Sequence, residues 1–125
     1  MSAKRADYAR VQEIYDVITQ TQRQIDSLGF DERRFTTPAD DAEDLIAEGI
    51  MNRVFRVTEE AGHVSEETAL RYGFDRAGIN GVRNRLAHAY GEVDRAIIWS
   101  VIKYDFPELL EACRRFCADK GLELG

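Results

Sequence analysis

The sequence predicts an all-α protein, an up-and-down bundle of about four to five helices, and three observations support this prediction. Apolar residues recur along most of the chain at alternating steps of three and four, which is the spacing of one helix face. Glycines and capping residues separate these stretches at short intervals. No segment shows the period-two alternation of a half-buried β-strand. At 125 residues the chain can bury one core, so we expect a single domain over residues 1–125.

The first predicted helix contains residues 8–25, where mostly apolar side chains form one stripe. Gly29 is expected to end this helix, because glycine readily adopts the left-handed conformation that is common at helix ends. The charged stretch DERRF follows at residues 31–35 and is interpreted as a connector between helices.

The second predicted helix begins near Thr37 and Pro38. The threonine can cap it, proline fits its first turn, and the acidic residues that follow favour the positive end of the helix dipole. Helical spacing of apolar residues then continues to about residue 64. Ser65 is expected to begin a short helix, which Gly73 ends.

The second half of the chain is predicted to hold two further helices, or three if the chain restarts at residues 105–108. Asp75 can cap a helix that contains residues 79–90, and Asp94 can cap the next one. Residues 105–108, with the sequence DFPE, are expected to restart or kink the chain, because proline lacks a hydrogen-bond donor. The last helix is expected to end near Gly121.

Composition disfavours several classes of protein. No apolar run approaches the roughly 20 residues needed to cross a bilayer, so we expect no membrane partner. The polar N-terminus lacks the apolar stretch of a signal peptide, which favours a cytoplasmic protein. Cys113 and Cys117 lie four residues apart in a helical pattern and are interpreted as reduced core residues. With only two histidines in the chain, a structural zinc site is disfavoured, and we expect no metal and no cofactor.

The charge is distributed unevenly along the chain. A net charge of −6 argues against a general nucleic-acid binder. Residues 71–90, however, contain four arginines and a single aspartate. A small cationic region in an acidic chain suits the local recognition of an anion better than the wrapping of a long nucleic acid.

The stretch RNRLAHAY, residues 83–90, combines side chains that suit a reaction site. On a helix, Asn84 and His88 are neighbours on a face far from the apolar stripe, and Arg83 and Tyr90 share the border of the core. The predicted apolar stripe consists of Ile79, Val82, Leu86 and Ala89.

The chemistry of this stretch matches the cleavage of a phosphodiester without a metal. A histidine can take or give a proton near neutral pH, and a guanidinium can hold a phosphate through two oxygens. Asn84 could orient the imidazole of His88 or bind the substrate. An ordinary solvated helix face is the alternative explanation for the arginines. Gly78 and Gly81 weaken the helix, which indicates close helix packing or, alternatively, access for a ligand backbone.

The motif Arg83-Asn84-(x3)-His88-Ala89-Tyr90 resembles the arginine, four residues, histidine, one residue, tyrosine motif of the HEPN superfamily. The greatest similarity is to HepT-like toxins of MNT–HEPN toxin–antitoxin pairs. Glu59 lies where that family has an Ile-Gly-Glu segment, and residues 97–99 and 105–109 resemble its closing helices. The similarity covers roughly residues 8–120.

This resemblance implies a dimeric, metal-independent endoribonuclease in which two motifs face a shared cleft. Arg83 and His88 would be catalytic and Asn84 supporting, and we assign Glu59 and Arg85 to substrate binding. Tyr90 would be the residue that a partner nucleotidyltransferase antitoxin adenylylates. The partners expected are therefore RNA, a second copy of the chain and that antitoxin. The alternative is a catalytically silent HEPN module that binds a nucleotide or a nucleotidyltransferase subunit.

Overall fold

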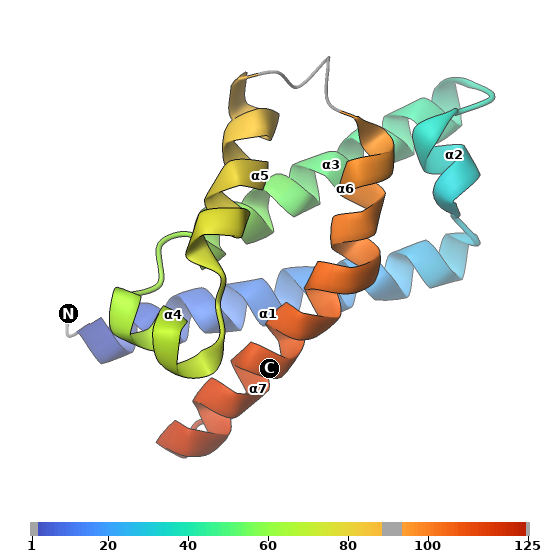
Figure 1. Cartoon of the computed structure of the whole chain (residues 1–125). Coiled ribbons are helices and arrows are strands. Elements are labelled where there is room, and N and C mark those ends of the chain that lie inside the picture. The colour runs from blue at the N-terminus through green and yellow to red at the C-terminus, as the bar shows by residue number, and fades with distance from the viewer. Residues whose placement is uncertain (1–2, 89–93, 125) are drawn as a thin grey trace.

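The structure is a computed structural model that describes the backbone of residues 3–88 and 94–124 and the side chains of residues 6–87 and 94–124. The described residues form helices and connections and contain no strand, which confirms the predicted all-α bundle (Figure 1). Five helices have seven residues or more: α1 (Ala3–Leu28), α3 (Asp41–Ala61), α4 (Glu66–Tyr72), α5 (Arg76–His88) and α7 (Phe106–Lys120). Shorter elements are α2 (Glu32–Thr36), α6 (Arg95–Ser100) and the π-helical turn η2 (Val101–Asp105).

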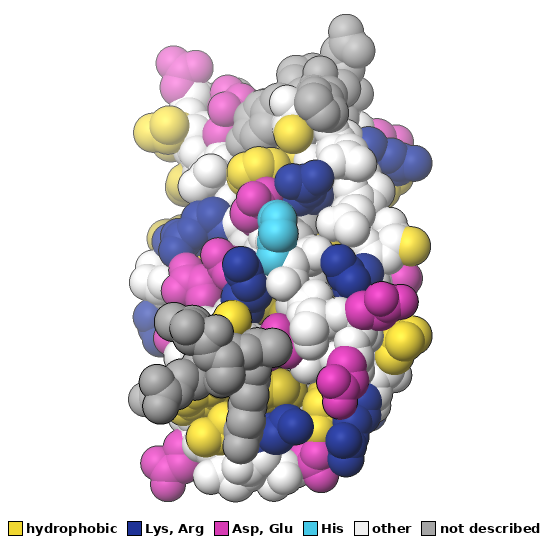
Figure 2. Space-filling model, turned by 90° about the vertical axis from the view of Figure 1, so that its left-hand side faces the viewer, with side chains coloured by type: hydrophobic (Ala, Val, Ile, Leu, Met, Phe, Trp, Pro, Cys, Tyr) yellow, Lys and Arg dark blue, Asp and Glu magenta, His cyan; other side chains and the backbone are white. Residues whose placement is uncertain are grey.

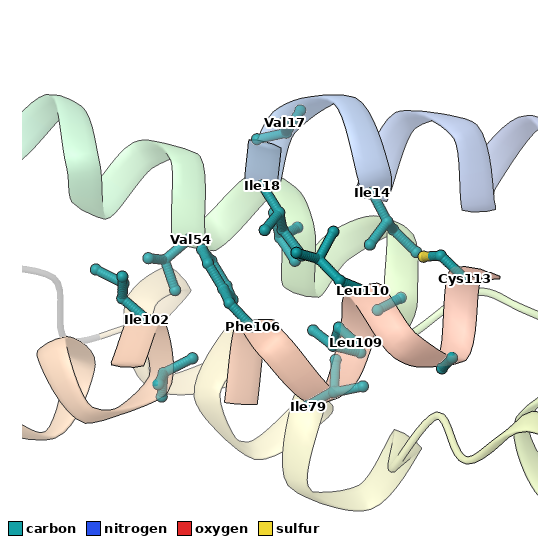
Figure 3. Close-up of a cluster of buried hydrophobic side chains, with 14 of the residues drawn as sticks. Ile14, Val17, Ile18, Val54, Ile79, Ile102, Phe106, Leu109, Leu110 and Cys113 are labelled. Carbon is teal, nitrogen blue, oxygen red and sulfur yellow. The ribbon is translucent and has the colours of Figure 1, made fainter. Parts of the chain in front are cut away.

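The two longest helices, α1 and α3, pack against each other. Helix α7 packs on α1, and α5 packs chiefly on α3. In Figure 1, α6 and α7 follow one another through η2, with α6 upright in this view and α7 slanting away below it. Apolar side chains from four helices and η2 converge between these elements (Figure 3), among them Ile14, Ile18, Val54, Ile79, Ile102, Phe106 and Leu110.

Most helix ends lie where the sequence predicts them. Gly29, Gly73 and Gly121 have positive φ angles of 60°, 88° and 66°, so each provides the left-handed residue after a helix. At the start of α4, the Ser65 hydroxyl accepts a hydrogen bond from the backbone of Thr68. These predictions succeed because caps act over three or four residues of local sequence.

The connector predicted at residues 31–35 is wrong, because these residues form α2 and its cap. Asp31 is the cap, and its side chain accepts a hydrogen bond from the backbone N–H of Arg34. Phe35 is fully buried, and its ring lies 5.3 Å from that of Trp99 in α6. The Asp31 cap and the burial of the Phe35 ring together favour a helical conformation in this charged stretch.

The predicted start of the second helix is also wrong by about three residues. Helix α3 begins at Asp41, with Asp40 as its cap, and the Asp40 carboxylate accepts a hydrogen bond of 2.8 Å from the backbone N–H of Glu43. Thr37 instead ends α2, where its N–H and its hydroxyl both donate to the carbonyl of Arg33. The helix ends at Ala61 rather than near residue 64.

The kink or restart predicted at residues 105–108 takes the form of the π-helical turn η2. The N–H of Phe106 donates to the carbonyl of Val101, five residues earlier, and Pro107 lies in the first turn of α7. The wider turn accommodates the proline ring, which would clash with a carbonyl in a regular α-helix. Among the described helices, none combines the length and the apolar character needed to cross a membrane.

Candidate active site

A close approach between the end of α3 and the middle of α5 creates the site. A Cβ atom on Gly62 would lie 2.3 Å from Oδ1 of Asn80 and 3.0 Å from the carbonyl oxygen of Thr58. Only glycine therefore lets Asn80 lie over the end of α3 without a shift. Asn80 is one turn before Arg83 on α5, so this contact brings Arg83 to Glu59 in the last turn of α3.

The two glycines of α5 do not make the close helix contacts that the sequence indicates. Gly81 is exposed, and a Cβ there would meet nothing within 4 Å. At Gly78 a Cβ would meet the carboxylate of Asp75, which caps α5 by accepting a hydrogen bond of 3.1 Å from the Gly78 N–H. The glycine in close contact with the other helix is thus Gly62, which lies against the Asn80 side chain of α5. Gly81 instead leaves one turn of α5 open to an approaching group.

Arg83 is the central side chain of the site. Its Nη1 lies 3.2 Å from Oε2 of Glu59 in an ion pair, and its Nη2 donates a hydrogen bond of 3.0 Å to Oδ1 of Asn84. The side chains of Arg83 and Glu59 retain 31% and 41% of their exposure, so both remain accessible to a ligand. The Nε of Arg83 is buried and makes no hydrogen bond within the described part of the chain. The guanidinium is therefore held in place by two neighbours, with its outer edge at the surface.

The predicted faces of α5 are confirmed as far as the description extends. Ile79 and Leu86 are buried and Val82 is half-buried, whereas Asn84 and Arg85 are exposed. Among the described residues, Arg85 makes no hydrogen bond or ion pair that would neutralise it. Arg83 and Arg85 thus differ in kind: Glu59 anchors Arg83, whereas Arg85 is exposed and unpaired within the described residues.

Two predicted site residues fall outside this geometry. His88 is the last residue of α5, but its side chain lies outside the described residues. Tyr90 lies outside them completely, as does Ala89 of the predicted apolar stripe. Of the predicted site residues, the structure brings Glu59, Arg83 and Asn84 together, whereas Arg85 is exposed on the same helix and shares no hydrogen bond or ion pair with them within the described residues.

Sequence reasoning missed the role of the residues that surround Glu59. His63 is exposed, as predicted for a residue at a helix end, and its Nδ1 lies 2.6 Å from the carbonyl oxygen of Glu59. Glu60 points to another neighbour and forms an ion pair of 3.1 Å with Arg10 of α1. Gly62 was the available signal. It is buried at the end of α3, and its φ of −71° is one that any residue can adopt, so its backbone conformation does not require glycine.

The charges around the site are mixed. On the face shown in Figure 2, basic and acidic side chains alternate and flank a patch of histidine surface. Where this face is not covered by grey atoms, it shows no continuous basic stripe. Within the described residues, no three His, Cys, Asp or Glu side chains form a group that could hold a metal ion. A single anchored guanidinium suits one phosphate group rather than an extended backbone.

The sequence of the chain matches one known protein family. The model of the family described as Ribonuclease HepT-like matches residues 11–116. No curated protein and no solved structure matches the chain. The matched region contains the whole segment from Glu59 to His88, which confirms the resemblance that the arginine–histidine motif carries. The chain therefore belongs to the HepT-like ribonuclease family.

Proposed function

We propose that this protein is a metal-independent endoribonuclease that cleaves RNA by attack of the ribose 2′-hydroxyl on the adjacent phosphate. Membership of the HepT-like ribonuclease family implies ribonuclease activity on RNA. Within the structure, the proposal rests on the Arg83 guanidinium, which Glu59 and Asn84 hold at the surface of α5, five residues before His88. A guanidinium fixed in this way can bind a phosphodiester through two oxygens.

Each residue of the motif has a distinct proposed role. Arg83 binds the scissile phosphate and stabilises the charge that develops there in the transition state. Asn84 accepts from Arg83 through Oδ1, so its amide nitrogen can donate to a substrate oxygen or to the imidazole. His88 transfers a proton, which is the usual role of histidine near neutral pH. Arg85, exposed on the next position of the helix, attracts a neighbouring phosphate of the strand.

We further infer that the protein is the toxin of a toxin–antitoxin pair and acts as a homodimer. In the HEPN pairs that it resembles, two motifs face one cleft, and a nucleotidyltransferase antitoxin adenylylates the tyrosine that corresponds to Tyr90. The open surface of α5 around Gly81 and Arg85 is compatible with a second copy. An AMP group on Tyr90 would bring a phosphate and an adenosine to the site and exclude RNA by charge and by volume.

A cleavage assay on matched RNA and DNA strands tests the proposed reaction. We expect the purified protein to cleave RNA in EDTA, to leave a 2′,3′-cyclic phosphate or its 3′-phosphate product, and to spare DNA of the same sequence. Arg83→Ala should lower the rate by at least about 100-fold, as expected for the loss of a group that stabilises the transition state. Arg56→Ala is the matched control, because Arg56 is also half-exposed but pairs with Glu13 of α1.

Four results would contradict the proposal in different ways, three of them for the reaction and one for its control. Equal cleavage of DNA would exclude attack by the 2′-hydroxyl, and activity that requires added magnesium would exclude a metal-free reaction. Tight RNA or nucleotide binding without cleavage would instead support the silent HEPN module. For control by the antitoxin, intact-mass and peptide mapping after co-expression should show AMP on Tyr90, and neutralised protein without this adduct would refute that part.

A further inference from the structure

We propose that Glu59 recognises the 2′-hydroxyl of the bound nucleotide and accepts its proton, so that it is the general base of the cleavage reaction. This inference rests on the function proposed above and assigns the proton transfers within it. It starts from the contact between the Glu59 carboxylate and the Arg83 guanidinium, whose atoms Oε2 and Nη1 lie 3.2 Å apart.

A carboxylate in a phosphate-binding site needs a specific reason to be there. An ionised carboxylate can only accept hydrogen bonds, and a phosphodiester has no hydrogen to donate. Glu59 therefore cannot bind the phosphate that Arg83 attracts, and its charge repels it. The nearest donor that RNA offers beside the scissile phosphate is the ribose 2′-hydroxyl, which is also the group that distinguishes RNA from DNA. A glutamate at this position is thus suited to the hydroxyl and not to the phosphate.

The geometry of the ion pair places Glu59 within reach of that hydroxyl. A phosphate bound to Arg83 carries its own ribose, whose 2′-oxygen is separated from the phosphorus by only four covalent bonds, so that attack closes a five-membered ring. The Glu59 carboxylate contacts the same guanidinium, and Oε1 is the oxygen that takes no part in this ion pair. Both side chains are partly exposed, so a strand can enter from solvent and meet both groups. A general base must lie within hydrogen-bonding reach of the proton that it removes, and this arrangement meets that condition.

The reaction then balances with the residues of this chain. The Glu59 carboxylate takes the proton from O2′, and O2′ forms a bond to phosphorus as the bond from phosphorus to O5′ breaks. Protonated His88 gives a proton to the departing O5′, so the products are a 2′,3′-cyclic phosphate and a free 5′-hydroxyl. Arg83 stabilises the additional negative charge on the phosphoryl oxygens during this step. Proton exchange with water returns Glu59 to its ionised form and His88 to its protonated form.

The fold keeps Glu59 in position independently of its carboxylate. Glu59 lies in the last turn of α3, whose backbone holds the residue whether or not its side chain is charged. Glu59→Gln keeps the size of the side chain and an oxygen that can still accept from Arg83, but the amide does not accept a proton at neutral pH. The variant therefore separates proton transfer from positioning.

The decisive experiment compares Glu59→Gln with Glu60→Gln. Both variants remove one negative charge from adjacent positions, but Glu60 pairs with Arg10 and does not contact Arg83. We expect Glu59→Gln to lower the single-turnover rate of RNA cleavage by about 100- to 10,000-fold, the usual contribution of general acid–base catalysis. It should leave unchanged, or tighten, the binding of an uncleavable strand with 2′-deoxyribose at the scissile position. Glu60→Gln should cleave at a rate close to that of the wild type.

A substrate with a sulfur atom in place of the bridging O5′ distinguishes the base from the acid. A thiolate leaves without a proton, so His88→Ala should recover much of its rate on this substrate. Glu59→Gln should not recover, because attack by the 2′-oxygen still needs a base. Recovery of Glu59→Gln would overturn the proposal, as would weaker binding with an unchanged rate, which would mean that Glu59 only positions Arg83.

The neighbouring histidine provides the remaining comparison. His63→Ala should retain activity, and a loss equal to that of Glu59→Gln with a normal thermal melt would make His63 the base instead. Wild-type protein that cleaves no RNA would count against the proposed function as a whole. Wild-type cleavage together with full activity of Glu59→Gln would count against this inference alone.

Discussion

Asp7 shows how one residue connects elements that are far apart in the sequence. Its buried carboxylate accepts hydrogen bonds from the Ser65 backbone at 2.9 Å, from the Ser65 hydroxyl at 2.6 Å and from the Thr68 hydroxyl at 2.5 Å. One side chain of α1 thereby holds the beginning of α4. Burial by itself would raise the pKa of Asp7, but these hydrogen bonds and the nearby Arg10 together hold the pKa below its ordinary value of 3.8.

We predict that Asp7 makes the stability of the fold dependent on pH. Since its pKa is lower in the folded state, its contribution is present above the unfolded pKa of about 3.9 and is lost as the pH falls through the folded pKa. Urea unfolding at pH 7 should show that Asp7→Asn loses about 1.5–3 kcal/mol, the usual value of hydrogen bonds to a charged group. Between pH 5 and pH 3, which are values chosen for the titration, the wild type should lose more stability than the variant. Asp16→Asn, at an exposed position of the same helix, is the control, and identical pH curves for all three proteins would refute the prediction.

The residues of the site were predictable to different degrees. Arg83, Asn84 and Arg85 are identified by their spacing on one helix, which is a property of local sequence. The contact from Glu59 to Arg83 joins residues 24 positions apart. Only the family resemblance pointed to Glu59. Helical periodicity predicts on which face of its own helix a side chain lies, but not which other helix that face contacts. The contact between Gly62 and Asn80 lies beside this ion pair, and the periodic pattern of apolar residues does not predict it.

At the level of helices, the same distinction separates the correct predictions from the wrong ones. Helix ends that depend on a nearby cap or a left-handed glycine were predicted within a few residues. Helix α2 was missed although Asp31 caps it locally, because the burial of Phe35 depends on contacts from much later in the chain. The Trp99 ring packs on Phe35, and Arg95 donates a hydrogen bond of 3.1 Å to the Phe35 carbonyl. Neither contact can be inferred from the five residues of α2.

Gly81 yields a prediction about α5 as an element. Alanine there would meet no atom within 4 Å, so Gly81→Ala should stabilise the isolated helix by up to about 1 kcal/mol through its higher helix propensity. If the open turn receives RNA or a second copy, the same change should lower the rate of cleavage. Thermal melts and single-turnover rates measure the two effects separately.

Gly49 of α3 offers a matched control for that experiment. It is also exposed, and a Cβ there would also meet nothing within 4 Å. Gly49→Ala should therefore raise the melting temperature and leave cleavage unchanged, because this position contacts no residue of the site. Gly81→Ala with higher stability and full activity would show that nothing approaches this turn closely.

For the whole molecule, the buried core rather than the surface charge supplies the stability. Ion pairs join helices at several points, such as Arg56 with Glu13 at 2.8 Å and Arg95 with Asp44 at 3.2 Å. Exposed pairs of this kind typically contribute less than about 1 kcal/mol each. The core instead draws side chains from α1, α3, α5, η2 and α7, so loss of any of these elements exposes the others (Figure 3).

The two cysteines allow opening of the whole core to be measured. Cys113 and Cys117 are both buried in α7, and burial raises the pKa of the Cys113 thiol to about 12 and also raises that of Cys117. Because the thiolate is the reactive form, both should react with a disulfide reagent at pH 8 only when α7 separates from the core. Denatured protein should react at once with two equivalents.

The labelling rate can then test whether the native protein gains stability from a second copy. A dimer that dissociates before the core opens gains stability by mass action, so the reaction should slow as the protein concentration rises above the dissociation constant. A rate that is independent of concentration over the micromolar range would show that association adds nothing to the stability of the fold. If either thiol reacts rapidly in native protein, α7 opens locally, and the core does not behave as one cooperative unit.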